Sequence, residues 1–172
     1  MVDNEWLERT GLVYGDTDVV DRWDISAVER DVLLQNGLPR FVPPFFEATL
    51  QSETEPVMAS KNHGMLYKIG WGLGNNIGIA QKGGGVYAAD GGVYTADSEE
   101  LEDDYFVNSS LGHFVKLIHR VGYHQAKVIT SSEEDADRAL ALLRREVVEI
   151  DPPAFVEGWW SLVFEQMEHG LM

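Results

Sequence analysis

Short apolar runs separated by glycine and asparagine dominate the middle of the chain. They predict strands at residues 45–50, 65–69, 76–81, 86–89, 93–95 and 105–107. The connections between them, such as residues 70–76, are short turn-like segments rather than the helical crossovers that parallel strands need. The pattern therefore predicts a mainly antiparallel central sheet of about five or six short strands.

Helical spacing of apolar positions flanks this β region on both sides. The first 25 residues contain isolated apolar positions that indicate short helical turns. Ser26 and Glu29 have the spacing of a capping box, which predicts a helix from there to about Gln35. Gly37 follows, as expected of a helix C-terminus.

After Asn108 the chain becomes helical again. Leu111, Phe114, Val115, Ile118 and Val121 form one apolar helical stripe. Two C-terminal helices are expected to follow. The first is capped at Ser131-Ser132 and runs to about Glu149. The second begins at Asp151-Pro152-Pro153, with an apolar face formed by Val156, Trp159, Trp160, Val163 and Met167.

Strands followed by helices are typical of an α+β fold, in which helices pack on the sheet. A length of 172 residues suits a single domain. Within it we expect an N-terminal helical region (1–35), a sheet core with one helix (36–130) and a C-terminal helix pair (131–172).

Composition narrows the class of protein. The chain has no cysteine, which excludes disulfides and thiolate zinc sites. Its opening has neither the basic nor the apolar region of a secretory signal, and no run is long and apolar enough for a membrane helix. We therefore expect a cytoplasmic protein.

The net charge of −16, from 13 Lys and Arg against 29 Asp and Glu, disfavours nucleic acid and acidic membranes as partners. It favours a basic protein partner, because complementary fields speed encounter. Acidity that serves only solubility, or that reflects a salty cytoplasm, is the open alternative.

A near-repeat, GGVYAAD followed by GGVYTAD, begins at Gly84. Its glycines are not followed by the Lys-Ser or Lys-Thr of a phosphate-binding loop, and two seven-residue copies cannot form a solenoid. Asp90-Gly91 is instead a two-residue hairpin signal. It predicts a register with Tyr87 opposite Tyr94, Val86 opposite Thr95 and Ala88 opposite Val93.

An acidic run follows the repeat, with six carboxylates in eight residues: Asp97, Glu99, Glu100, Glu102, Asp103 and Asp104. It is either a solvated loop or a docking surface for Lys and Arg of a partner. Trp71, among glycines, is a candidate aromatic anchor for the same contact, or it folds back on the sheet.

Catalytic and metal-binding patterns are weak. No HExxH or GxSxG motif occurs, and His119 and His124 are five residues apart, which does not place them on one helix face. Ser109 and Ser110 are explained by helix capping. We expect no cofactor, no metal and no enzymatic activity. A pocket that brings His113 or His119 together with carboxylates would favour a ligand-binding protein or an enzyme.

Several segments in order resemble the SUKH superfamily, whose fold is Syd-like. They are Tyr67-Lys-Ile-Gly70, Ile77-Gly-Ile-Ala80, Gly85-Val-Tyr-Ala-Ala-Asp90 and Phe106-Val-Asn-Ser-Ser-Leu111 with Phe114, and at the tail Trp159 or Trp160 with Glu165-Gln-Met and Gly170-Leu171. The similarity runs from about residue 36 to the C-terminus. Its motif positions include Gly85, Tyr87, Asp90, Asn108, Ser109 and Ser110, which we interpret as structural.

The resemblance implies an α+β fold and an immunity protein that neutralises a polymorphic toxin of a competing bacterium. The expected partner is a basic nuclease or deaminase toxin domain. An intracellular adaptor of the same fold, which binds a host protein, is the alternative.

Overall fold

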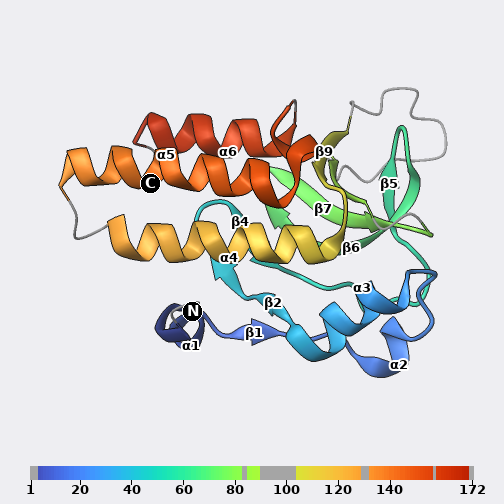
Figure 1. Cartoon of the computed structure of the whole chain (residues 1–172). Coiled ribbons are helices and arrows are strands. Elements are labelled where there is room, and N and C mark those ends of the chain that lie inside the picture. Colours follow the sequence, from blue (N-terminus) through green and yellow to red (C-terminus); the bar gives the residue numbers. More distant parts are fainter. Residues whose placement is uncertain (1–3, 83–84, 90–103, 129–131, 157, 171–172) are drawn as a thin grey trace.

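The computed structural model describes residues 4–82, 85–89, 104–128, 132–156 and 158–170 (Figure 1).

Within these residues the centre of the molecule is a seven-stranded antiparallel sheet, which confirms the predicted antiparallel pairing but has more strands than the five or six expected. Its strand order is β3-β4-β6-β7-β8-β9, and β5 pairs with β6 beside this path. The strands are β3 (Phe41–Val42), β4 (Phe46–Ala48), β5 (Met58–Ser60), β6 (Gly64–Gly72), β7 (Asn75–Ala80), β8 (Val86–Ala89) and β9 (Tyr105–Asn108). A separate two-stranded ribbon joins β1 (Leu12–Val13) to β2 (Leu38–Pro39).

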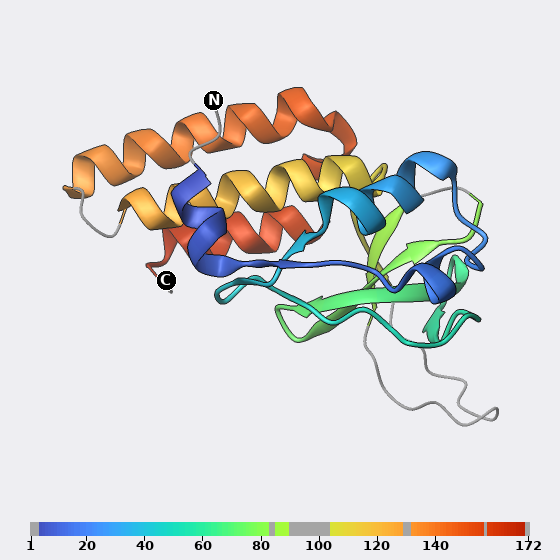
Figure 2. The same cartoon turned by 90° about the horizontal axis from the view of Figure 1, so that it is seen from below.

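The helices form two groups. The first group is N-terminal and contains α1 (Asn4–Thr10), α2 (Thr17–Val20), α3 (Ala27–Asp31) and the π-helical turn η1 (Val32–Asn36). The second contains α4 (Leu111–Val128), α5 (Glu133–Ile150), the 3-10 turn η2 (Pro152–Phe155) and α6 (Trp159–Glu168). In both views α4, α5 and α6 run alongside one another as a bundle at one end of the molecule (Figures 1 and 2). The α+β prediction, including two C-terminal helices, is therefore confirmed.

Local capping explains where two of these helices begin. Ser26 and Glu29 form the predicted capping box, in which each side chain accepts a hydrogen bond from the other residue's backbone N–H. Ser132 is the N-cap of α5, because its hydroxyl oxygen accepts a hydrogen bond from the N–H of Asp135. Both caps satisfy amides that a helix cannot satisfy internally.

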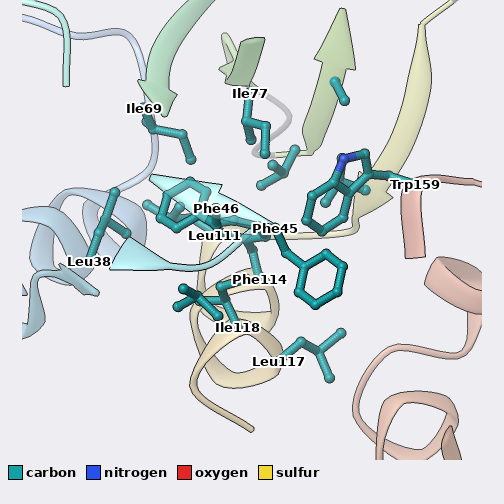
Figure 3. Packing of buried hydrophobic residues seen from close by; sticks show 14 of the residues in the cluster. Leu38, Phe45, Phe46, Ile69, Ile77, Leu111, Phe114, Leu117, Ile118 and Trp159 are labelled. Atoms are coloured by element: carbon teal, nitrogen blue, oxygen red, sulfur yellow. The ribbon is translucent and has the colours of Figure 1, made fainter. Parts of the chain in front are cut away.

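The core lies between the helices and the inner face of the sheet, which we define as the face that carries Tyr67, Ile69, Ile77 and Ile79. Phe46 and Phe114 meet edge to face with their ring centroids 5.1 Å apart, and Trp159 is buried beside them (Figure 3). The buried cluster includes residues from Trp6 to Met167, so the N-terminal and C-terminal helices share one core.

Three expectations are wrong in detail. The first concerns residues 70–76, which were expected to form a turn-like connection but lie mostly within strands. Gly70 and Gly72 belong to β6, and only a tight turn at Leu73 and Gly74 separates it from β7. A Cβ at Gly72 would lie 2.0 Å from the carbonyl oxygen of Phe45. Close backbone packing, rather than a loop, therefore explains this glycine.

The second concerns the hairpin register. Tyr87 of β8 lies opposite Gly78 of β7 on one side and Phe106 of β9 on the other. Both hydrogen-bonding edges of β8 are therefore occupied, and Tyr94 cannot be the partner of Tyr87. The predicted strand at 93–95 lies outside the described residues.

The third concerns the last helix, which begins at Trp159 rather than near Asp151. Pro152 starts a short 3-10 turn instead, and Val156 is 77% exposed rather than part of the apolar face. Trp159, Trp160, Val163 and Met167 are buried as predicted.

Candidate partner-binding surface

The outer face of the sheet, which points away from the core, carries a row of side chains across four strands. Phe41 lies opposite Glu47, Glu47 opposite Trp71, and Trp71 opposite Asn76. Directly opposite residues in antiparallel strands share a face. Because their strand neighbours Val42 and Phe46 are buried in the core, this cross-strand row points outward.

The row is exposed and has an unpaired charge at its centre. Phe41 is 49% exposed and Trp71 is 45% exposed, and the carboxylate of Glu47 is also exposed. Within the described part of the chain Glu47 has no ion pair and no side-chain hydrogen bond. Trp71 therefore has the exposure expected of an aromatic anchor, and its neighbours Phe41 and Glu47 come from segments that the sequence did not connect with it.

At the other end of the outer face the side chains are apolar and more buried than those of the row. Met58, Leu66 and Ala89 form a small buried cluster there, with Ala80 and Tyr87 packed against it. Gly78 lies beneath it, because a Cβ at this position would be 2.8 Å from the sulfur of Met58. The ring of His63 stacks on that of Tyr87, with centroids 3.6 Å apart.

Asp104, the last carboxylate of the acidic run, is bound to the turn between β5 and β6. It accepts hydrogen bonds from the hydroxyl of Ser60 and from the N–H of Asn62. Burial, and secondarily the charge of Asp104, raise the pKa of Tyr87. Asp104 therefore fastens the end of the acidic run to the sheet, and its role in partner binding stays a prediction.

Asp97, Glu99, Glu100, Glu102 and Asp103 lie outside the described residues, as does Asp90 of the structural motif. Trp71 and the turn that holds Asp104 lie at opposite ends of β6, about 20 Å apart at ~3.3 Å per residue. The two predicted partner-binding residues that the structure describes, Trp71 and Asp104, therefore do not lie side by side.

The Asn108-Ser109-Ser110 motif connects the end of β9 to the start of α4. The hydroxyl oxygen of Ser110 accepts a hydrogen bond from the N–H of His113, which is the predicted cap. Asn108 and Ser109 instead bind Asp151, which is 1% exposed at the end of α5. Its carboxylate accepts bonds from Asn108 Nδ2 (2.7 Å), Ser109 N (2.8 Å) and Ser109 Oγ (2.7 Å).

Trp160 completes this network by donating its indole N–H to Asn108 Oδ1 at 2.9 Å. Sequence reasoning found the motif but missed its acceptor, because Asp151 lies 42 and 43 residues away from the donors. The only signal was an aspartate just before a Pro-Pro pair.

The histidines do not assemble a nucleophilic or metal site. His113 Nδ1 lies 3.8 Å from Asp151 Oδ1, but the hydroxyl of Ser109 donates to Asp151 rather than to the imidazole. His119 stacks on Trp6, and burial lowers its pKa to about 4; burial also lowers the pKa of His124. In the ranges that the structure describes, no group of three or more His, Cys, Asp or Glu side chains could hold a metal ion.

One depression of about 380 Å³ lies on α5, lined by Asp135, Arg138, Ala139, Ala141, Leu142 and Arg145. It is lined by a single helix and lacks a histidine or a hydroxyl nucleophile. Within the described residues, no helix is long and apolar enough to cross a membrane.

Comparison with known families agrees with this fold. The SUKH-4 immunity protein family matches residues 3–166. The chain belongs to the SUKH-4 immunity protein family. The match includes the first 35 residues, where sequence inspection found little similarity. Neither the curated proteins nor the solved structures provide a match.

Membership of the SUKH-4 family indicates an immunity function against a toxin. It also confirms the resemblance to the SUKH superfamily drawn from the strand motifs and the Asn-Ser-Ser cap.

Proposed function

We propose that this SUKH-4 protein neutralises a cognate nuclease or deaminase toxin in the cytoplasm by binding it directly, without modifying it. The family match over residues 3–166 carries the proposal. The net charge of −16 supports a basic partner, since complementary fields favour association. The exposed cross-strand row supports a contact through the sheet, because exposed aromatic side chains are common anchors of interfaces.

Binding without chemistry is supported by the arrangement of polar groups in the described residues. The buried carboxylate of Asp151 is saturated by donors from Asn108 and Ser109, and Ser109 has no histidine to accept its proton. The network joins the end of β9 to the end of α5, which supports a structural role for these polar groups.

The test is co-expression with the product of the adjacent gene. We expect the protein to rescue cells from that toxin and to form a stable complex with a catalytically inactive toxin variant. Intact-mass measurement should show an unchanged toxin, and toxin activity should return when the complex is dissociated. Failure to rescue together with failure to form a complex would contradict the proposal, and a lasting change in the toxin's mass would contradict the non-enzymatic mechanism.

A further inference from the structure

The cross-strand row contains a carboxylate as well as aromatic rings. It can therefore select a partner's side chain more specifically than an exposed apolar patch can. Glu47 lies directly between Phe41 and Trp71 on neighbouring strands, so the three Cβ atoms are spaced by about 4.5–5.5 Å each. The backbone of all three residues is engaged in the sheet ladder, which fixes the positions from which the side chains project. The result is a carboxylate on a rigid base with an aromatic ring on either side.

The carboxylate of Glu47 has no cation of its own. Among the described residues no Lys, Arg or His nitrogen lies within ion-pair distance of it, although other exposed carboxylates of the chain, such as Glu134 and Asp135, are paired with arginine. Lys68 is on the same face but does not form this pair. A partner's cation can therefore bind here without displacing an internal one.

An arginine fits this arrangement better than a lysine. Its planar guanidinium can donate two parallel hydrogen bonds to a carboxylate while its faces stack on aromatic rings. Cation–π contact with Trp and Phe adds attraction, and it is strongest for tryptophan. Asn76, the next residue in the row, adds an amide that can bond to the backbone on either side of such an arginine.

We propose that Phe41, Glu47 and Trp71 form the binding site for an arginine side chain of the protein partner. The identity of that partner as a toxin rests on the proposed function, whereas the preference of the row for arginine does not. Asp104, the last carboxylate of the acidic run, is held about 20 Å from the row along β6. The acidic run would attract a basic partner, and the row would fix one of its arginines.

The first experiment tests the site without any toxin. The whole protein is titrated with N-acetyl-arginine amide, and the indole N–H signals are followed by NMR. Four of the five tryptophans are buried, so the exposed Trp71 should give the signal that moves, and a Trp71→Phe variant assigns it. We expect a saturable shift of this signal with arginine, a weaker one with N-acetyl-lysine amide and none with the uncharged citrulline analogue.

Glu47→Gln keeps the shape of the side chain and removes its charge, so it should abolish the arginine-induced shift. Glu149→Gln, which removes an exposed carboxylate at the end of α5, is the matched control and should leave the shift unchanged. An equal shift with citrulline, a shift that persists in Glu47→Gln, or no saturable shift at all would overturn the arginine site.

The second experiment uses the inactive toxin encoded by the adjacent gene. Glu47→Gln and Trp71→Ala should each weaken the complex by about tenfold or more, as expected for central interface residues. Tyr14→Ala, at an aromatic residue that is 52% exposed elsewhere, should change affinity by no more than about twofold. A complex that forms with unchanged affinity in both row variants would overturn this proposal and leave the immunity function intact. If no toxin binds at all, the proposed function fails, and the arginine titration still decides the site.

Discussion

Among single residues, Asp151 joins three parts of the fold. It ends α5, precedes η2 and binds the Asn108-Ser109 pair at the end of β9. Its two oxygens accept three hydrogen bonds in a site with almost no access to water. A buried carboxylate is tolerated only when donors replace its hydration, and this network supplies them.

Asp151→Asn should therefore lower the free energy of unfolding by about 2–4 kcal/mol, because one oxygen acceptor becomes an NH₂ donor that faces existing donors. Urea unfolding at pH 7 measures the effect. Asp137→Asn, at an exposed position of α5, is the control and should change stability by less than about 0.5 kcal/mol. Equal stability of the two variants would show that the network contributes little.

His119 gives a second prediction at the residue scale, through pH. Burial against Trp6 lowers its folded-state pKa to about 4, whereas an unfolded histidine titrates near 6.5. Between these values the unfolded chain binds a proton that the folded chain does not. Stability therefore falls as the pH decreases from 6.5 to 4.

His119→Phe removes the titrating imidazole, and with it the pH dependence of stability that His119 causes, while an aromatic ring remains to stack on Trp6. The loss of stability between pH 6.5 and pH 4 should be smaller than in the wild type by on the order of 1–2 kcal/mol, allowing for partial exposure. Unfolding curves at several pH values measure it, with the exposed His169→Gln as control. Parallel pH profiles for wild type and His119→Phe would contradict the assignment.

At the scale of elements, α1 packs on α4 where a glycine leaves room for it. A Cβ at Gly122 would lie 1.7 Å from the indole of Trp6. Trp6 is buried there although α1 is only seven residues long, too short to be a stable helix alone. The position of α1 therefore depends on this contact.

Gly122→Ala should displace Trp6 and lower the free energy of unfolding by about 1–3 kcal/mol, despite the better helix propensity of alanine. Gly112→Ala is the matched control in the same helix, because the nearest atom to its added Cβ is Ser110 Oγ at 3.9 Å. It should be neutral or stabilising by up to about 1 kcal/mol. Hydrogen exchange of the α1 amides should rise only in Gly122→Ala, and slow exchange of α1 in that variant would contradict the packing argument.

Local signals in the sequence predicted elements well where side-chain periodicity and capping decide them. The α4 stripe, the Ser26–Glu29 box and the Ser132 cap depend on neighbours three or four residues apart, and all are present. Asp90-Gly91 is also a local turn signal, but pairing of β8 with β7 and β9 rules out the strand register that this signal predicted. Gly70 and Gly72 of β6 have no local signal, because the close approach of Phe46 to Gly70 and of Phe45 to Gly72 comes from a segment distant in sequence.

The candidate site was predictable only in part for the same reason. The sequence indicated Trp71 as a candidate aromatic anchor without settling its exposure, and Phe41 and Glu47 become its neighbours only through strand pairing. Neither has a local motif, and Asp104 has internal partners that composition alone cannot reveal.

For the whole molecule, the net charge of −16 predicts how fast a basic partner is captured. Removing five carboxylates of the acidic run by changing Asp97, Glu99, Glu100, Glu102 and Asp103 to Asn or Gln should slow association with the toxin about tenfold at low salt. It should also reduce the dependence of the rate on ionic strength, because charges that face the partner during approach dominate steering. Asp104 is left unchanged because it anchors the turn between β5 and β6.

The control removes five exposed carboxylates elsewhere, at Glu8, Glu133, Asp137, Glu149 and Glu165, and so changes the net charge equally. Stopped-flow measurements at several salt concentrations compare the two variants. If the acidic run faces the toxin, its variant should lose most of the salt dependence while the control loses little, and dissociation should change less than association in both. Equal losses in the two variants would mean that overall charge, and not the position of the run, attracts the partner.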